Sequence, residues 1–491
     1  MFASVTSVAL VGVHPRPVQV EAHVGTSSGN SAFNLVGLPD TAVREAKERV
    51  RAAMASCGYV FPERRITVNL SPADLPKAGA VYDLPIALAV LAALKYIKPG
   101  ATGAVCLGEL ALDGKVRPVR GALGAALIAS RRGARCVVPV GSGSDAWNLD
   151  GVDIRAVPNL RDAVAASLGE LVGGPDPTGV AEEPATRDMS EVRGMAAARR
   201  ALEIAAAGGH HVLMNGPPGA GKTMLARCVP GILPPLSAGE GLEVALAWAA
   251  GGRQRPAAAR PPFRAPHHSA TVAAIVGGGS GIPVPGEVSL AHRGVLFLDE
   301  LGEFPTHLLD ALRQPLEDGE IVVARKGASV RFPSRFQLIS ATNPCPCGFN
   351  GDRLVACKCS QRAIERYGRR LSGPLADRID LRVRVVRIEK DELVGPPGES
   401  SAAVRGRVLV ARERQEARGV LNRDLRRQDV DDLAWSREAK NLVESAMTSM
   451  ALTARGWERV RRVAVTIADL GESDPIESHH VAEALAFRGS A

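Results

Sequence analysis

One segment constrains the fold of this 491-residue chain more than any other. It fits the P-loop pattern G-x-x-x-x-G-K-[ST] and consists of Gly216, Pro217, Pro218, Gly219, Ala220, Gly221, Lys222 and Thr223. The apolar stretch 211–214 predicts a strand before it, and residues 224–227 begin a helix after it. Such a loop lets backbone N–H groups close on phosphate oxygens at the positive end of the helix dipole. The segment therefore predicts a nucleotide-binding α/β domain.

Two acids follow the P-loop at a distance typical of an ATP site. The apolar run 295–298 predicts a buried parallel strand that ends in Asp299 and Glu300. Asp299 lies 77 residues after Lys222. Lys222 is expected to reach the β- and γ-phosphates, and Thr223 and Asp299 to hold Mg²⁺. Glu300 would orient and polarise the attacking water. These residues predict the hydrolysis of ATP with Mg²⁺ as cofactor.

A third apolar stretch, residues 336–342, predicts another strand and is followed by Asn343. At the end of this strand the Asn343 side chain is placed to contact the attacking water or the γ-phosphate. The following Pro344 also suits a simple strand-end turn, so this role stays open between the two readings.

Positive charge is concentrated in one part of the chain. The formal net charge is +8, and residues 321–370 alone hold ten Lys or Arg against two acids, Asp352 and Glu365. Basic residues that gather in one segment favour contact with a polyanion. The first residues lack the basic leader and cleavage site of a signal peptide, and the most apolar run, 84–94, is too short to span a bilayer. We therefore expect a cytoplasmic protein with no membrane contact.

Composition and periodicity predict three domains. Residues 1–171 alternate strand-like stretches such as 66–70 with helix-like stretches at 41–56 and 83–94, as in an α/β domain. Residues 172–188, rich in Gly, Pro and acids, are the predicted linker. The nucleotide-binding α/β domain is expected over 189–390, and the Ala-, Arg- and Leu-rich residues 391–491 predict an α-helical domain.

Four of the eight cysteines form a cluster with the spacing C-x-C-x₉-C-x-C: Cys345, Cys347, Cys357 and Cys359. Four thiolates this close together in sequence could surround one tetrahedral Zn²⁺. Two alternatives stay open at this point, namely reduced cysteines without a metal and a redox site. The other four cysteines are scattered along the chain and do not indicate a disulfide framework.

The motifs GPPGAGKT, GVLFLDE, SATNPCPCG and SGPLADRID, in this order, resemble the magnesium-chelatase-like AAA+ ATPases of the ComM/YifB family. The resemblance covers essentially the whole chain. It implies an AAA+ P-loop core, a parallel sheet with flanking helices, followed by a C-terminal α-helical lid. This sequence departs from the family pattern at Met195, where the family usually has Gln. The difference puts in doubt only the contacts that this residue would make around the adenine.

The resemblance also assigns two arginines and an assembly. Arg378 matches the arginine finger, which would reach the γ-phosphate bound by a neighbouring subunit, and Arg455 matches the second sensor on the lid. Arg459 and Arg462 are nearby rivals for the second sensor, and an ion pair with Asp377 or Asp380 is the structural alternative for Arg378. An arginine finger implies a ring, and the family suggests a homo-hexamer.

The N-terminal domain resembles a Lon-protease-like or S5-like α/β fold. A Ser–Lys dyad needs both groups, but the two matching positions hold Val81 and Leu123. We therefore expect this domain to be catalytically inactive.

ComM-type relatives are branch-migration helicases, so the resemblance implies single-stranded or branched DNA as the partner, with recombination proteins as possible further partners. Residues 321–332 predict a hairpin. In related ATPases such a hairpin enters the ring pore, where Arg325, Lys326 and Arg331 would contact phosphates. A solvated surface hairpin is the alternative. Two other functions stay open: a motor subunit of magnesium chelatase, and a protein remodeller without DNA activity.

Overall fold

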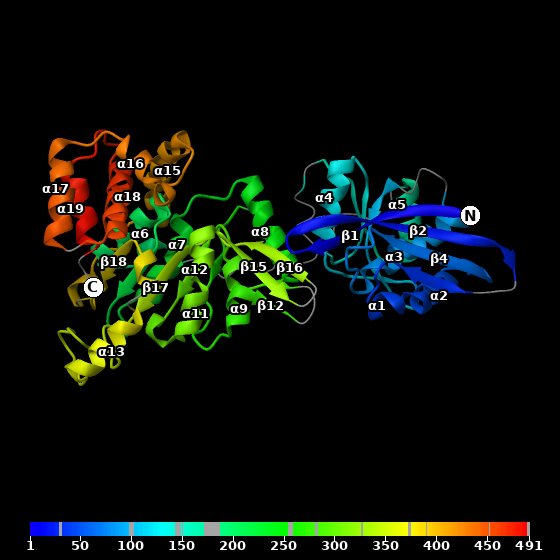
Figure 1. Cartoon of the computed structure of the whole chain (residues 1–491), viewed down its shortest axis with the longest axis horizontal. Helices are drawn as coiled ribbons and strands as arrows, with labels where there is room; N and C mark the ends of the chain where they lie inside the picture. Colours follow the sequence, from blue (N-terminus) through cyan, green and yellow to red (C-terminus); the bar gives the residue numbers. More distant parts are fainter. Residues whose placement is uncertain are drawn as a thin grey trace.

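The structure is a computed structural model of the whole chain. It describes residues 1–28, 32–97, 103–142, 149, 151–170, 187–253, 259–279, 283–325, 328–371, 375–388, 390–450 and 452–488. Figure 1 shows an elongated molecule with an N-terminal α/β unit at one end, a second α/β unit in the middle and a helical bundle at the other end. None of the helices within the described residues has the length and apolar character needed to cross a membrane.

The N-terminal unit is built on a seven-stranded mixed sheet in the order β3-β4-β2-β1-β5-β8-β9. Its strands are β1 (Phe2–Val11), β2 (His14–Ser28), β3 (Phe33–Val36), β4 (Arg64–Ser71), β5 (Val105–Cys106), β8 (Cys136–Pro139) and β9 (Ile154–Val157). Its helices are α1 (Thr41–Arg44), α2 (Ala46–Ser56), α3 (Asp83–Ala93), α4 (Ala122–Arg132) and α5 (Leu160–Leu168), and β6 (Glu109–Leu110) pairs with β7 (Val116–Arg117). Helix α3 is apolar all round and almost wholly buried, as expected for a helix inside a core.

The middle unit contains a five-stranded sheet in which every pair of neighbours is parallel. The order is β11-β14-β17-β10-β18, with β10 (Val212–Asn215), β11 (Phe263–Arg264), β14 (Val295–Leu298), β17 (Gln337–Thr342) and β18 (Leu381–Arg384). Because the strands are parallel, their carboxyl ends share one edge of the sheet. This edge therefore brings together the loops that follow β10, β14 and β17. The mixed α/β architecture with a parallel sheet agrees with the predicted α/β fold class.

Helices and two short hairpins surround this sheet. The helices are α6 (Ala196–Gly208), α7 (Lys222–Ile232), α8 (Ala238–Ala250), α9 (Val272–Val276), α10 (Glu287–Leu290), α11 (Thr306–Ala311), α12 (Arg313–Asp318), α13 (Gln361–Leu371) and α14 (Lys390–Val394). The hairpins are β12 (Gly277–Gly278) with β13 (Val284–Pro285), and β15 (Glu320–Arg325) with β16 (Ala328–Pro333). Helix α13 lies away from the sheet, at the edge of the molecule (Figure 1).

The C-terminal bundle consists of α15 (Ser401–Arg418), α16 (Arg427–Asp431), α17 (Arg437–Ser449), α18 (Ala454–Leu470) and α19 (Ser478–Ala486). Ser400, Ser436 and Thr453 cap α15, α17 and α18, each accepting a hydrogen bond from a backbone N–H in the first turn. Buried side chains of these helices share one hydrophobic core with α6, α7 and the central strands. The bundle is therefore packed directly on the nucleotide-binding unit.

The sequence-based expectations for single elements agree with the structure apart from one break. The predicted strand 66–70 lies within β4, the predicted helix 83–94 is α3, and the predicted hairpin is β15–β16. The predicted helix 41–56 is divided at Glu45, the residue between α1 and α2. The predicted linker 172–188 lies outside the described residues except for Arg187 and Asp188, so the domain boundaries stay predictions.

Candidate nucleotide site and cysteine cluster

The P-loop follows β10 and leads into α7, as its sequence predicts. Gly219 and Gly221 have φ values of +73° and +84°, a left-handed conformation that favours glycine. The Lys222 side chain is only 8% exposed, and its Nζ donates to the backbone oxygens of Gly216 (2.5 Å) and Pro217 (2.9 Å) and to Oδ1 of Asn343 (3.2 Å). Burial lowers the pKa of Lys222, while the carboxylates of Asp299 and Glu300 oppose that effect. The structure thus brings together the lysine and the asparagine that the sequence placed 121 residues apart.

The acids at the end of β14 lie next to the start of α7. Thr223 Oγ1 donates to Asp299 Oδ2 at 2.6 Å. One hydroxyl and one carboxylate at this distance are oxygen ligands that suit Mg²⁺. Glu300 has a φ of +52°, a conformation that is costly for a residue with a side chain and often occurs at functional sites. The five residues predicted to handle the nucleotide, Lys222, Thr223, Asp299, Glu300 and Asn343, therefore meet at this edge.

His268, in the loop after β11, contacts Glu300. The Nδ1 atom of His268 lies 3.4 Å from Glu300 Oε2, and the His267 and His268 rings are 4.0 Å apart. His268 follows β11, which neighbours β14, so the strand order explains the contact. The basic segment 251–270 contains this pair in sequence, but which of the two rings reaches an acid depends on the fold.

The two arginines assigned by resemblance line one pocket on the other side of the unit. The pocket has a volume of about 220 Å³, and its walls are His211, Leu316, Glu317, Arg378, Asp380, Arg423, Asp424, Arg455, Arg459 and Arg462. No P-loop residue belongs to this lining. Arg378 forms an ion pair with Glu317, which is neither of the two acids named as alternatives from sequence.

The rivals for the second-sensor role have other contacts. Arg459 lies 3.4 Å from the buried Asp380, and Arg462 lies 4.0 Å from Glu458 one helical turn away. Arg455 is exposed at the start of α18 and forms no ion pair within the described residues. Of the three, Arg455 is therefore the one whose guanidinium is available to a ligand.

Met195, where the family usually has Gln, contacts the P-loop. It precedes α6 with a φ of +51°, and its Cε would lie 2.9 Å from a Cβ placed on Gly221. The side chain therefore packs against the turn just before Lys222. A larger residue at Gly221 would not fit there.

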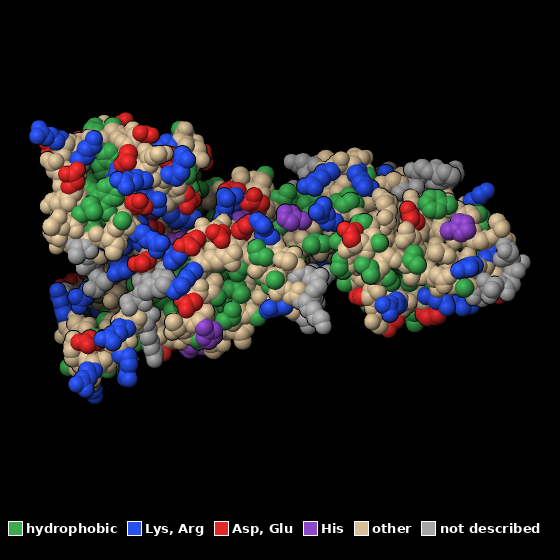
Figure 2. Space-filling model, viewed as in Figure 1, with side chains coloured by type: hydrophobic (Ala, Val, Ile, Leu, Met, Phe, Trp, Pro, Cys, Tyr) green, Lys and Arg blue, Asp and Glu red, His purple; other side chains and the backbone are tan. Residues whose placement is uncertain are grey.

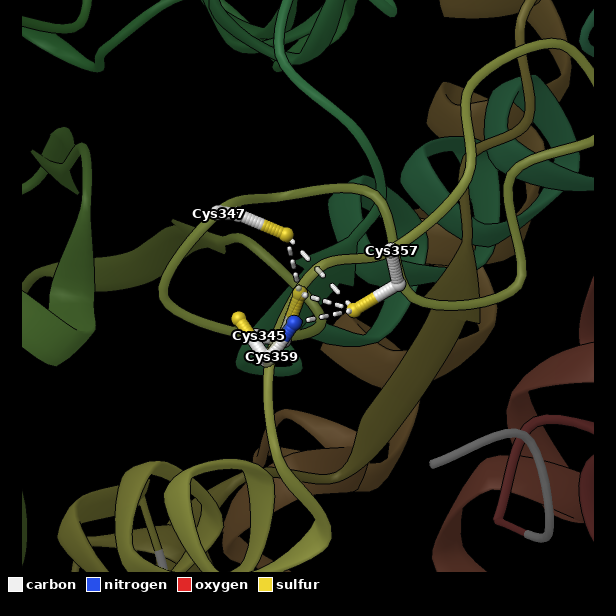
Figure 3. A group of neighbouring side chains, drawn as sticks. All are labelled: Cys345, Cys347, Cys357 and Cys359. Atoms are coloured by element: carbon white, nitrogen blue, oxygen red, sulfur yellow. Dashed lines mark hydrogen bonds between the residues drawn. The ribbon is translucent and has the colours of Figure 1, made fainter.

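The four cysteines of the cluster converge (Figure 3). Their sulfur atoms all lie within 4.8 Å of one another, with separations of 3.4 Å for Cys345–Cys347, 3.6 Å for Cys345–Cys357 and 3.6 Å for Cys347–Cys357. Disulfide sulfurs would lie about 2 Å apart. Sulfurs on a zinc tetrahedron lie about 3.8 Å apart, because each Zn–S bond is about 2.3 Å. The geometry suits four zinc ligands.

Backbone N–H groups support the cluster. Asn350 N donates to Cys345 Sγ at 3.3 Å, and Cys359 N donates to Cys357 Sγ at 3.4 Å. Backbone hydrogen bonds from Phe349 and Lys358 also lower the pKa of the Cys347 thiol, to about 6. Such bonds favour thiolates, the form that binds metal.

The loop that carries the first two cysteines touches the P-loop. Gly348 has a φ of +85°, and a Cβ added there would lie 2.5 Å from Pro218 Cδ. The same loop begins at Asn343, the partner of Lys222. The cysteine cluster is thus attached to two parts of the nucleotide site.

Of the three residues predicted to contact DNA, the structure describes two, Arg325 and Arg331. Arg325 is exposed at the end of β15, and Lys326 lies outside the described residues. Arg331 is exposed but forms an ion pair with Glu320 Oε1 at 2.6 Å. The inner face of the hairpin belongs to a core that also packs against Val11 and Val13 of the N-terminal unit.

The N-terminal unit keeps apolar side chains at the two dyad positions. Val81 packs against the core, and Leu123 is 4% exposed within α4. The nearby Lys77 is buried, its Nζ donates to the backbone oxygen of Pro72, and burial lowers its pKa.

Three family models match the chain. Magnesium chelatase, subunit ChlI, matches residues 188–393, and its C-terminal model matches 398–488. A model described as subunit ChlI of Mg-chelatase matches residues 20–142.

Relatives that match over almost the whole chain define its family more narrowly than the family models do. The chain is 42% identical to the uncharacterized protein YifB of Escherichia coli over 98% of this chain and 96% of the relative. It is 41% identical to the competence protein ComM of Haemophilus influenzae over 99% and 97%, respectively. By contrast, the magnesium-chelatase 38 kDa subunit of Acidiphilium rubrum matches only 21% of this chain, at 34% identity.

Proposed function

The chain belongs to the ComM/YifB family of magnesium-chelatase-like proteins, and we propose that it is an ATP-hydrolysing motor that acts on DNA. One observation carries the ATPase part of this proposal. Lys222, Thr223, Asp299 and Asn343 come from three separate loops and are joined by hydrogen bonds at one edge of the parallel sheet. This arrangement is what ATP hydrolysis requires of a P-loop protein.

In this proposal the protein residues divide the work. The P-loop amides and Lys222 bind the phosphates, and Thr223 with Asp299 holds Mg²⁺, which neutralises phosphate charge when bound. Glu300 accepts the proton of the attacking water, and His268 fixes the position of the Glu300 carboxylate. The Asn343 side chain contacts the attacking water or the γ-phosphate and orients it.

We further propose that the pocket of Arg378 and Arg455 binds the nucleotide of a neighbouring subunit in a homo-hexamer. Both arginines line the same pocket, away from the P-loop of their own chain. A guanidinium supplied by a neighbour stabilises charge in the transition state and raises the rate by roughly 10³–10⁵. Glu317 holds Arg378 in the isolated chain and would exchange it for phosphate on assembly.

DNA is the proposed substrate, in single-stranded or branched form, and branch migration during recombination or DNA uptake is the proposed task. The printed name of one relative, competence protein, supports DNA uptake. The surplus of Lys and Arg in residues 321–370 supports a polyanionic partner. Recombination proteins in the cytoplasm would be further partners, and the N-terminal unit would serve in substrate engagement or ring assembly without catalysis.

We propose one structural Zn²⁺ for the cysteine cluster, because the sulfur separations approach the edges of a ZnS₄ tetrahedron. The metal would stiffen the loop between Asn343 and α13. Four protein ligands leave no open position, so the proposed role is structural.

The test is the ATPase rate of the purified chain without ligand, with single-stranded DNA, with a four-way junction, with an unfolded peptide and with a porphyrin. Each is measured at two salt concentrations, with Lys222→Ala as the blank. Stimulation by DNA that fades with salt supports the proposal. A rate that responds to the peptide or porphyrin and ignores every DNA would contradict it and favour a remodeller or a chelatase motor.

A further inference from the structure

Helix α13 is short and basic, with four Arg against one acid, Glu365. Together with the cysteine loop it forms a segment, residues 345–371, that we name the α13 arm. The arm holds six Lys or Arg against two acids, and Asp352 is already paired with Arg387. Its basic residues are Arg353, Lys358, Arg362, Arg366, Arg369 and Arg370.

The basic side chains gather on one face of α13. Arg362 and Arg366 are spaced four residues apart, Arg369 follows three residues later, and all three are exposed. This spacing places them on one side of the helix. Figure 2 shows Lys and Arg side chains gathered over this end of the molecule.

The opposite face of α13 is packed against the nucleotide site. The Tyr367 side chain is only 5% exposed. Its hydroxyl lies against Gly302, so a Cβ added to this glycine would be 2.5 Å from the hydroxyl oxygen. Burial raises the pKa of Tyr367, and the nearby Thr342 side chain and Asn343 backbone oppose that effect. Gly302 follows Glu300 by two residues, so one tyrosine touches both the segment after the proposed general base and the asparagine that binds Lys222.

Deepening the proposed function, on which this inference rests, we propose that the outer face of α13 binds DNA phosphates and that Tyr367 transmits their binding to the nucleotide site. Arginines one helical turn apart suit phosphate contacts that are independent of sequence. A lipid surface is the poorer match, because membrane-binding helices expose an apolar face, whereas Tyr367 of α13 is buried and Ala363 and Ile364 are partly buried. The β15–β16 hairpin is the poorer match for phosphates, because Glu320 forms an ion pair with Arg331.

The binding test uses fluorescence anisotropy of the full chain with labelled single-stranded DNA and a four-way junction, over a salt series. The variant is Arg362→Glu/Arg366→Glu, and the matched control is Arg437→Glu/Lys440→Glu on α17, which changes the net charge equally on another exposed surface. We expect the α13 variant to raise the Kd for DNA at least about tenfold and to lower the slope of log K against log salt by about two. The control should stay within about twofold of the wild type.

The outcomes separate the two proposals. If the wild type binds DNA and both variants lose the same affinity, net charge alone acts and the α13 surface is wrong, while the DNA motor stands. If the wild type binds no DNA, the proposed function itself fails. Tighter binding of an RNA of equal length and sequence would overturn DNA as the occupant of α13.

The coupling test uses Tyr367→Phe, which removes the hydroxyl and keeps the ring. We expect DNA affinity within about twofold of the wild type but a loss of most DNA stimulation of the ATPase, because the hydroxyl that packs against Gly302 and lies near Thr342 and Asn343 is gone. Full stimulation in Tyr367→Phe would overturn the role of Tyr367. Far-ultraviolet circular dichroism and a thermal melt of the same sample establish that the variant is folded.

Discussion

Lys222 and Gly348 show how single residues prepare the nucleotide site. The ammonium group of Lys222 is buried and satisfied by two P-loop carbonyls and by Asn343. A buried charge is tolerated when it has such partners. Gly348 supports the same loop from outside, because its lack of a side chain lets it approach Pro218.

At Gly348 a methyl group should disturb the P-loop. Gly348→Ala must place a Cβ 2.5 Å from Pro218 Cδ at a φ of +85°. We expect the affinity for a fluorescent ATP analogue to fall about tenfold, equivalent to about 1.4 kcal/mol. The analogue is titrated into each protein to measure the Kd.

Gly351→Ala is the matched control for this change. Gly351 also has a positive φ, +74°, but its added Cβ would meet only the end of the flexible Arg384 side chain, at 2.5 Å from Nη2. Equal loss of affinity in both variants would mean that the cysteine loop responds as a whole and that the contact with Pro218 has no special role.

Two buried histidines predict how stability depends on pH. Burial is the main cause that lowers the pKa of His211 to about 3 and of His292 to about 4. His211 Nδ1 accepts a hydrogen bond from Leu338 N at 3.0 Å, which protonation would remove. Both folded-state pKa values lie below the unfolded value of about 6.5, so the unfolded chain binds more protons as the pH falls from 6.5 to 4.

The free energy of unfolding should therefore decrease over this range, by about 3 kcal/mol at pH 5.5 for the two histidines together. Urea denaturation at pH 7.5 and pH 5.5 measures the decrease. His211→Asn keeps an acceptor for Leu338 N but does not titrate, so it should remove about half of the decrease. The same pH dependence in His211→Asn and in the wild type would show that His211 does not contribute.

At the scale of elements, the cysteine loop connects parts of the site that lie on different strands. It starts at the end of β17, touches the loop after β10 and leads into α13. A segment without a long helix or strand of its own needs another source of rigidity, and four converging thiols supply the ligands for one.

Metal content tests this proposal. We expect the purified chain to release about one Zn²⁺ on thiol modification, read with a metal-sensitive dye. Cys347→Ser/Cys357→Ser should release almost none and should melt at a lower temperature, because a ligand set of two thiolates binds zinc poorly. Cys57→Ser, at a buried cysteine of the N-terminal unit, is the control and should keep its zinc. A wild-type chain without zinc after purification free of chelators would contradict the proposal.

At the scale of the whole molecule, the division between the P-loop and the arginine pocket has a direct consequence. The groups proposed to bind ATP and the groups proposed to stabilise its transition state lie in separate places on one chain. A closed ring repeats the same contact between neighbours, so each pocket would meet the next P-loop.

Mixing two inactive variants tests this arrangement. Glu300→Gln removes the proposed general base, and Arg378→Ala removes the arginine supplied to a neighbour. Each variant alone should hydrolyse ATP very slowly. In an equal mixture about a quarter of the interfaces would pair an intact Glu300 with an intact Arg378, so activity should return to about a quarter of the wild type. No recovery, with assembly of mixed rings established by light scattering and a tag pull-down, would place Arg378 outside the shared site.

Local sequence determined much of this protein. The P-loop, the strands that end in Asp299 and Asn343, the buried helix α3 and the β15–β16 hairpin all follow from short patterns, because spacing and side-chain periodicity are set within a few residues. The cysteine spacing likewise predicted a group that converges.

Tertiary structure decided which distant residues meet. The contacts of His268 with Glu300, Tyr367 with Asn343 and Arg378 with Glu317 join residues from separate elements. Strand order in the parallel sheet and the packing of α13 place them, and neither leaves a local pattern in the sequence. The break at Glu45 and the pairing of Arg331 with Glu320 have the same cause, because the chain around each residue adapts to its neighbours in space.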